Sequence, residues 1–174
     1  MTNPWYVITG GPCSGKTTLI NALAAKGYRT VPEAARAVLE RGLAAGKTVE
    51  EMHADEPAFQ RELLQEKLAA EASLPEDEPV FFDRGIPDSI AYFARAGVTD
   101  DPALAAAVAG MKYRKAFLLE LLPYVNDPAR VEPEAEAKKI HEMIAGAYER
   151  AGIETVRVPV MTSEERLAFV LSRL

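Results

Sequence analysis

Apolar residues along this chain form short runs that alternate with longer amphipathic stretches. The amphipathic stretches carry apolar residues at three- and four-residue spacing, as in residues 57–72 and 134–150. Among the short runs, residues 5–9 are apolar enough to be buried on both faces of a sheet. The predicted strands are residues 5–9, 28–31, 80–83, 116–121 and 154–158. This alternation predicts an α/β fold with a five-stranded parallel sheet and helices on both faces.

A glycine-rich loop joins the first predicted strand to the first predicted helix. It meets the pattern G-x-x-x-x-G-K-[ST] in full, with a strand before it and a helix after it. Glycines let backbone N–H groups close on phosphate oxygens, and the helix N-terminus adds partial positive charge. The residues expected to bind a nucleoside triphosphate are Gly10, Gly11, Pro12, Cys13, Ser14, Gly15, Lys16, Thr17 and Thr18. The alternative is a glycine turn that binds no phosphate.

Two residues of this loop have individual roles in the pattern. Lys16 is expected to reach the β- and γ-phosphates, and the hydroxyl of Thr17 is expected to lie on Mg²⁺. The predicted strand 80–83 is apolar and ends in Asp83, as a Walker B strand does. Such a strand places a carboxylate next to the phosphate loop, where Mg²⁺ needs negative charge. Thr17 and Asp83 are therefore the predicted metal site. The alternative for Asp83 is an acid that caps the turn after the strand.

Glu33 follows the second predicted strand, at the edge of the sheet where open α/β folds bind ligands. Pro32 is expected to begin the next helix, which places Glu33 in its first turn. A carboxylate there can accept a proton or a hydrogen bond from a substrate hydroxyl. It can equally be a first-turn acid that stabilises the helix by about 0.3–1 kcal/mol. The sequence leaves both interpretations open.

Residues 122–133 contain too many prolines for an ordinary helix. A loop of this length in a small domain is usually functional, so we expect a lid over the nucleotide at about residues 123–136. Arg130 would then move onto the phosphates. The alternative is a surface arginine paired with Glu132 or Glu134.

Four further polar residues are less informative. His53 lies among acids and is expected to be a surface residue rather than a ligand. His141 is expected to have a surface or packing role. Gln60 and Arg61 are candidates to line a substrate pocket, although most such residues belong to a solvated helix face.

Composition narrows the class of protein. The 174 residues, 48% of them apolar, fit a single domain over residues 1–174. A net charge of −6 argues against nucleic acid or an anionic membrane as the main partner. Cys13 is the single cysteine, which excludes an internal disulfide and suits a reducing compartment. No run is as long as a membrane span and no signal peptide is visible, so we expect a cytoplasmic protein.

Four segments together resemble one known family. They are residues 7–18, Val31-Pro32-Glu33-Ala34-Ala35-Arg36, Phe82-Asp83-Arg84-Gly85-Ile86-Pro87-Asp88 and Val158-Pro159-Val160. They resemble the AAA-like P-loop domains allied to the ribosylnicotinamide-kinase half of bifunctional NAD-biosynthesis regulators. The resemblance covers nearly the whole chain, and it implies a three-layer P-loop NTPase fold with sheet order 2-3-1-4-5 and a lid.

The resemblance also assigns residues. Glu33 matches the acid near the acceptor hydroxyl in nucleoside kinases, and Arg84 matches the arginine of their Asp/Glu-Arg pair after the third strand. Cys13 departs from the family, in which many members have glycine or another small residue at this position. Phosphate binding tolerates the change because the side chain can point away, but the thiol makes the loop oxidisable.

The function predicted from these features is ATP-dependent transfer of a γ-phosphoryl group to a hydroxyl of a nucleoside-like metabolite. The expected ligands are ATP, Mg²⁺ and a small-molecule acceptor, and a homodimer is left open. One alternative is a nucleotide-binding regulatory module without an acceptor, although the Asn/Thr-Lys-x-Asp signature of ordinary GTPases is absent. Another is an ATPase subunit, which is disfavoured because 174 residues leave no room for a helical second domain. The sequence leaves the acceptor and the choice between ATP and GTP undetermined.

Overall fold

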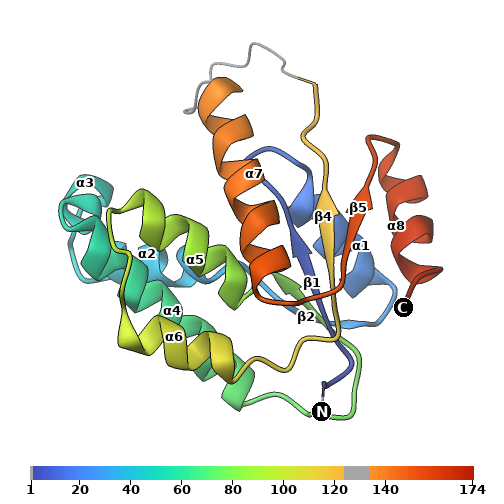
Figure 1. The fold of residues 1–174 in the computed structure, drawn as a ribbon, viewed down its shortest axis with the longest axis horizontal. Helices are drawn as coiled ribbons and strands as arrows, with labels where there is room; N and C mark the ends of the chain where they lie inside the picture. Colours follow the sequence, from blue (N-terminus) through green and yellow to red (C-terminus); the bar gives the residue numbers. More distant parts are fainter. Residues whose placement is uncertain (1, 124–133) are drawn as a thin grey trace.

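A parallel sheet of five strands lies at the centre of the computed structural model, which describes residues 2–123 and 134–174 (Figure 1). The strands are β1 (Trp5–Thr9), β2 (Arg29–Val31), β3 (Val80–Asp83), β4 (Lys115–Leu119) and β5 (Thr155–Val158). Their spatial order is β2-β3-β1-β4-β5, and all four pairings are parallel. The predicted fold class and strand order are therefore confirmed, and the predicted strands differ only at their ends.

Helices cover both faces of the sheet and give the fold three layers. They are α1 (Lys16–Ala25), α2 (Ala34–Ala44), α3 (Val49–His53), α4 (Glu56–Ala72), α5 (Ile86–Arg95), α6 (Pro102–Ala109), α7 (Glu134–Arg150) and α8 (Ser163–Leu171). Side chains on one face, such as Val7, pack with apolar residues of α4, α5 and α7. Those on the other face, such as Ile8, pack with residues of α1 and α8. Both faces are covered, so every residue of β1 is buried, as its continuous apolar run predicts.

The register of the sheet brings three loops together. Ile8 of β1 lies beside Asp83 of β3, and Val31 of β2 lies beside Phe82. Parallel strands end at the same edge, so the segments after β1, β2 and β3 meet there. This edge therefore receives the glycine-rich loop, Glu33 and Arg84.

Helix starts follow local sequence signals in most places. Capping boxes begin α3 at Thr48 with Glu51 and α8 at Thr162 with Glu165. The start of α2 differs, since its first residue is Ala34 and Glu33 is its N-cap residue with a ψ of 125°. The prediction that Pro32 begins this helix and that Glu33 lies in its first turn is wrong. The side chain of Glu33 makes no capping hydrogen bond, because its carboxylate turns to Arg84 instead.

Two other expectations concern the predicted lid and the presence of a membrane-spanning helix. The predicted lid lies mostly outside the described residues, as does Arg130, while residues 134–136 begin α7. Within residues 2–123 and 134–174, no helix combines the length and the apolar character that a membrane span needs.

Candidate active site

The loop after β1 has a backbone that requires glycine at its start. Gly10 has a φ of +138°, and Gly15, the last residue before α1, has a φ of +86°. A Cβ atom on Gly10 would lie 2.6 Å from the carbonyl oxygen of Leu119 in β4, which is closer than any side chain tolerates. Cys13 is exposed and has a positive φ of 58°. We call residues 10–15 the phosphate loop, after the pattern that they match.

Lys16 is the first residue of α1, and its side chain folds back over the phosphate loop. Its Nζ donates hydrogen bonds to the carbonyl oxygen of Gly11 at 2.8 Å and to Oγ of Ser14 at 3.3 Å. The side chain is buried, and this burial, together with the nearby charge of Arg84, lowers the pKa of Lys16 to about 8. An ammonium group that is already stripped of water interacts strongly with an incoming anion.

Two buried side chains from distant helices hold the phosphate loop in place. His141 of α7 accepts a hydrogen bond at Nδ1 from the backbone N–H of Gly11, at 3.1 Å. Arg166 of α8 donates to the carbonyl oxygens of Ser14 and, at 3.1 Å, of Glu120. Sequence reasoning missed both roles. For His141 a signal existed, because residues 141, 144 and 148 share one helix face that is buried. For Arg166 there was none, since an arginine on a surface helix is normally solvated.

Asp83 lies beside Thr17 at the C-terminal end of β3. Its Oδ2 accepts a hydrogen bond from Oγ1 of Thr17 at 3.4 Å, and its Oδ1 is buried without a hydrogen-bond partner among residues 2–123 and 134–174. Burial, with the nearby charge of Glu33, raises the pKa of Asp83 to about 6. A buried carboxylate oxygen without a partner calls for an explanation such as a bound ion.

The donor set around Asp83 fits Mg²⁺ better than a metal held by protein alone. In the part of the chain that the structure describes, no group of three or more His, Cys, Asp or Glu residues is arranged so that it could hold a metal ion by itself. Mg²⁺ usually keeps several waters and is held by one or two carboxylates together with substrate phosphates. Asp83 and Thr17 can supply such a partial shell. The alternative role for Asp83, capping the turn, falls instead to Asp88, whose Oδ2 accepts the backbone N–H of Gly85 at 2.9 Å.

Arg84 connects the phosphate loop to Glu33. Its backbone has a φ of +68°, and its guanidinium is buried. Nε donates to Oε1 of Glu33 at 2.8 Å, and Nη1 donates to the carbonyl oxygen of Gly10 at 3.1 Å and to Oδ1 of Asp88 at 3.0 Å. The guanidinium also lies over the ring of Tyr92, 5.2 Å from its centroid. Arg84 thus fixes the carboxylate of Glu33 at the edge of the phosphate loop.

Asp88 is the buried counter-ion of this arrangement. Besides Arg84 and Gly85, it accepts hydrogen bonds from Oγ1 of Thr9 at 2.7 Å and from the hydroxyl of Tyr148 at 2.6 Å. Burial alone would raise the pKa of Asp88, but the charge of Arg84 and these hydrogen bonds hold it below its ordinary value. A buried ion pair persists only when its remaining polar groups are satisfied, and Asp88 meets this condition. The sequence signal for it is an acid inside the apolar first turns of α5.

Tyr148→Phe is expected to lower the free energy of unfolding by about 1.5–3 kcal/mol, the usual contribution of a hydrogen bond to a charged group. The change removes one donor from the fully buried carboxylate of Asp88 and keeps the ring. Urea denaturation followed by circular dichroism measures the loss. Tyr28→Phe is the control, because the Tyr28 hydroxyl makes no hydrogen bond within the described residues. Equal losses in both variants would contradict the role of Asp88.

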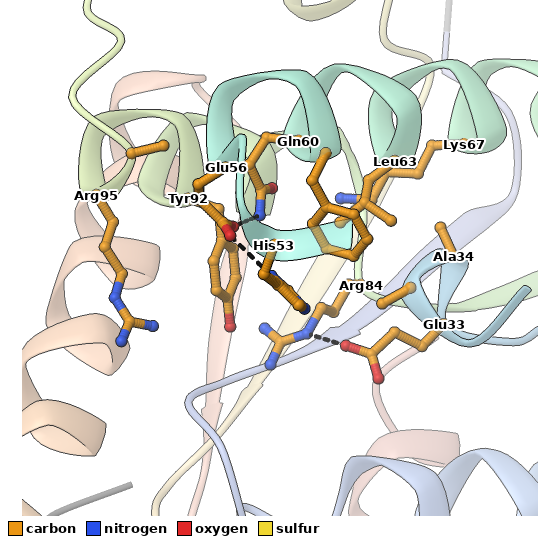
Figure 2. A pocket seen from close by; sticks show the side chains of 13 residues that line it. Glu33, Ala34, His53, Glu56, Gln60, Leu63, Lys67, Arg84, Tyr92 and Arg95 are labelled. Atoms are coloured by element: carbon orange, nitrogen blue, oxygen red, sulfur yellow. Dashed lines mark hydrogen bonds and ion pairs between the residues drawn. The ribbon is translucent and has the colours of Figure 1, made fainter. Parts of the chain in front are cut away.

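Two adjoining cavities open at this edge of the sheet. The loop cavity, of about 460 Å³, lies over residues 12–18 and is also lined by Glu33, Arg84 and Tyr92. The side cavity, of about 480 Å³, lies between α2, α3, α4 and α5 and is lined by the same three residues (Figure 2). Glu33 and Arg84 therefore stand where the two cavities meet.

The structure brings most of the predicted site residues together. Lys16, Thr17, Glu33, Asp83 and Arg84 all lie around the phosphate loop. Gln60 lines the side cavity as anticipated, and so does His53, whose side chain is still 41% exposed, in keeping with its expected surface position. Arg61 does not line that cavity, because its Nε donates to Oδ2 of Asp101 at 2.8 Å.

Comparisons with known proteins agree with this architecture. Residues 5–166 match the family model described as an AAA domain. A structure of NadR in complex with NR has a TM-score of 0.72 and 18% identity, covering 97% of this chain and 49% of that chain. NadR in complex with NAD and AMP-PNP has a TM-score of 0.69 and 17% identity, with coverages of 97% and 48%. The chain thus spans about half the length of these NadR chains.

Another solved structure is similar to this chain over almost its whole length, unlike the longer NadR chains. Thymidylate kinase from Ehrlichia chaffeensis has a TM-score of 0.64 and 13% identity, covering 99% of this chain and 98% of that chain. None of the curated proteins matches the sequence significantly. At these identities the solved structures establish the fold, whereas the family model matches the sequence itself from β1 into α8. The chain therefore belongs to the AAA domain family and has the fold of NadR and thymidylate kinase.

Proposed function

We propose that this protein is a kinase that transfers the γ-phosphoryl group of ATP to a hydroxyl of a nucleoside-like metabolite. One observation carries the proposal: Glu33 and Arg84 line both the loop cavity and the side cavity. A triphosphate in the first and a second molecule in the second would meet at the carboxylate of Glu33. The similar structures support this, since NadR was solved with NR and with AMP-PNP, and the other neighbour is a thymidylate kinase.

On the donor side, the chain's own groups bind and neutralise the phosphates. The backbone N–H groups of the phosphate loop and the N-terminus of α1 face the triphosphate, and Lys16 lies on its β- and γ-oxygens. Thr17 and Asp83 would hold Mg²⁺, which would neutralise the charge that develops on the transferred group. His141 and Arg166 keep the loop in its binding shape through Gly11 and Ser14. Phosphoryl transfer needs positioning and charge neutralisation more than covalent chemistry.

On the acceptor side, Glu33 orients the attacking hydroxyl. Its Oε1 is bound to Nε of Arg84, while 40% of its side chain remains exposed, which leaves the carboxylate accessible to a second donor. The acceptor O–H donates to this carboxylate, the hydroxyl oxygen attacks the γ-phosphorus, and Glu33 takes the proton as ADP leaves. The side cavity, which we now call the acceptor cavity, has the volume of an ordinary small-molecule site.

The direct test is acceptor-dependent formation of ADP. ATP and Mg²⁺ are incubated with the protein and a panel of nucleosides and vitamin-like alcohols, and both ADP and phosphorylated acceptor are quantified. The proposal expects one chemical class to raise ADP formation well above hydrolysis by water, with one phosphorylated product for each ADP. A rate that is the same with every compound would favour a nucleotide-binding module without an acceptor.

Asp83→Asn is expected to raise the Mg²⁺ concentration needed for half-maximal turnover by about 10–100-fold, the usual cost of losing a group that supports a metal. The amide keeps the shape of the side chain but gives up the negative charge beside Thr17. A Mg²⁺ titration of ADP formation measures the change, and circular dichroism verifies the fold. Asp77→Asn, the same substitution in an exposed loop, should leave the titration unchanged. An unaltered Mg²⁺ requirement in Asp83→Asn would remove Asp83 from the metal site.

A further inference from the structure

One wall of the acceptor cavity carries a polar cluster that the transfer chemistry does not use. His53 ends α3, Glu56 begins α4, and Gln60 lies one turn further along α4. Nδ1 of His53 lies 2.7 Å from Oε2 of Glu56, and Nε2 of Gln60 donates to Oε1 of Glu56 at 2.7 Å. All three line the cavity (Figure 2). Both oxygens of the Glu56 carboxylate are thus occupied by its two neighbours.

This contact sets the tautomer of His53. A carboxylate can only accept hydrogen bonds, so Nδ1 at this distance must carry a proton. In the neutral ring the other nitrogen, Nε2, then carries a lone pair and is an acceptor. Nε2 of His53 has no hydrogen-bond partner within residues 2–123 and 134–174. Figure 2 shows the ring extending from Glu56 towards Arg84, with its second nitrogen inside the cavity.

The surroundings keep this arrangement in place. The ring of Phe59 packs against that of His53, with centroids 4.2 Å apart, and limits its rotation. Burial would raise the pKa of Glu56, but the hydrogen bonds from His53 and Gln60 hold it below its ordinary value. Glu56 therefore stays a carboxylate at neutral pH and keeps the proton of His53 on Nδ1. The cavity thus presents a fixed hydrogen-bond acceptor next to an aromatic surface.

We propose that His53 is a specificity-determining residue for the acceptor. Its Nε2 accepts a hydrogen bond from an N–H or O–H group of a ring-bearing acceptor, and Glu56 is the positioning residue that aims the imidazole. The proposal rests on the proposed function in one respect, since it takes this cavity to be the acceptor site. The donor group can belong to the ring of a nucleobase or to the sugar.

The experiment measures binding after a group is removed from the probe, from the protein, or from both. Two probe series are titrated calorimetrically without ATP at pH 8. One series is uridine, 3-methyluridine and 2′-deoxyuridine, and the other is adenosine, N6,N6-dimethyladenosine and 2′-deoxyadenosine. The methylated probes lack a ring donor, and the deoxy probes lack a sugar donor. Removing the recognised donor should weaken binding about tenfold, the worth of one hydrogen bond.

The same loss should follow from changing the protein. His53→Ala should weaken the parent nucleoside about tenfold, and it should then bind parent and donor-lacking probe equally, because the contact is already gone. Glu56→Gln should weaken the parent nucleoside in the same direction. Glu50→Ala is the matched control, because Glu50 is an exposed acid of α3, the helix that His53 ends. This change should leave nucleoside affinity at the wild-type value. In turnover, His53→Ala should raise the KM of the acceptor and leave kcat and ATP affinity unchanged.

Four results would overturn the proposal. Two concern His53→Ala: it binds the parent nucleoside as tightly as wild type does, or it loses affinity equally for all probes of a series. The other two are that Glu56→Gln binds the parent nucleoside as tightly as wild type does, and that no nucleoside of either series binds to the wild-type protein. These results are separate from failure of the proposed function. Phosphoryl transfer with unchanged acceptor affinity in His53→Ala would support the kinase and reject this role. Donor-dependent binding without any transfer would support this role and reject the kinase.

Discussion

Lys16→Ala is expected to weaken binding of the Mg²⁺ complex of a non-hydrolysable ATP analogue by about 10²–10³-fold, the usual loss when a buried donor to a developing or fixed anion is removed. The ammonium of Lys16 is held at the phosphate loop by Gly11 and Ser14, and it is already desolvated. Binding of the phosphates therefore gains its full charge interaction without a further cost of dehydration. Alanine removes that charge and leaves the loop backbone otherwise unchanged.

Isothermal titration calorimetry measures this loss, and Lys26→Ala is the matched control. Lys26 is the C-cap residue of the same helix and is exposed, so its removal should leave nucleotide affinity at the wild-type value. Near-ultraviolet circular dichroism of both variants tests whether the packing is native. A native Lys16→Ala variant that binds nucleotide as tightly as wild type would refute the assignment of residues 10–18 to phosphate binding.

Glu33→Gln should cut phosphoryl transfer to the acceptor by about 10²–10⁴-fold, the typical contribution of a positioned general base. Glutamine has nearly the same shape, and its amide oxygen can still accept from Nε of Arg84. It cannot take a proton from a hydroxyl at neutral pH. ATP binding and slow hydrolysis to water should persist, since neither depends on that proton transfer.

Single-turnover reactions with an identified acceptor measure transfer and background hydrolysis side by side. Glu40→Gln is the control, because Glu40 is an exposed acid on α2 that pairs only with Arg36 among the described residues. Transfer should fall in Glu33→Gln alone. Equal losses of transfer and hydrolysis would point to damage at the metal or the fold and would reject Glu33 as the base.

The strands and the phosphate loop were predictable because their signals are local, whereas the order of the strands was predicted from the family resemblance. Each central strand is buried on both faces, so its apolar run stands out in the sequence, and the phosphate loop is a continuous motif. Glu33 shows where local rules fail. Pro32 favours an immediate helix start, yet the carboxylate of Glu33 is drawn to the guanidinium of Arg84, which lies far away in the sequence. Such a pairing leaves no periodic trace.

The supporting residues of the candidate site were unpredictable for the same reason. His141 binds Gly11, and Tyr148 binds Asp88, each through one hydrogen bond between distant elements. The charged residues near His53 in the sequence are all acids, and its place in a cavity arises from the packing of α3 and α4 with α5. Sequence spacing determines which residues share a helix face, but not which face meets which cavity.

The order of the strands has a consequence for synthesis of the chain. Trp5 of β1 pairs with Val80, and Tyr6 pairs with Lys115, so the strand that precedes the phosphate loop acquires its neighbours late. Contacts between residues so far apart close only at a large entropic cost, and topologies built from them fold slowly. A nascent chain on the ribosome would therefore contain the complete loop motif long before Leu119 is synthesised. The carbonyl oxygen of Leu119 is the atom that leaves no room for a side chain at Gly10. If the phosphate loop binds nucleotide as proposed, nucleotide can stabilise the protein only after β4 has been translated and has joined the sheet.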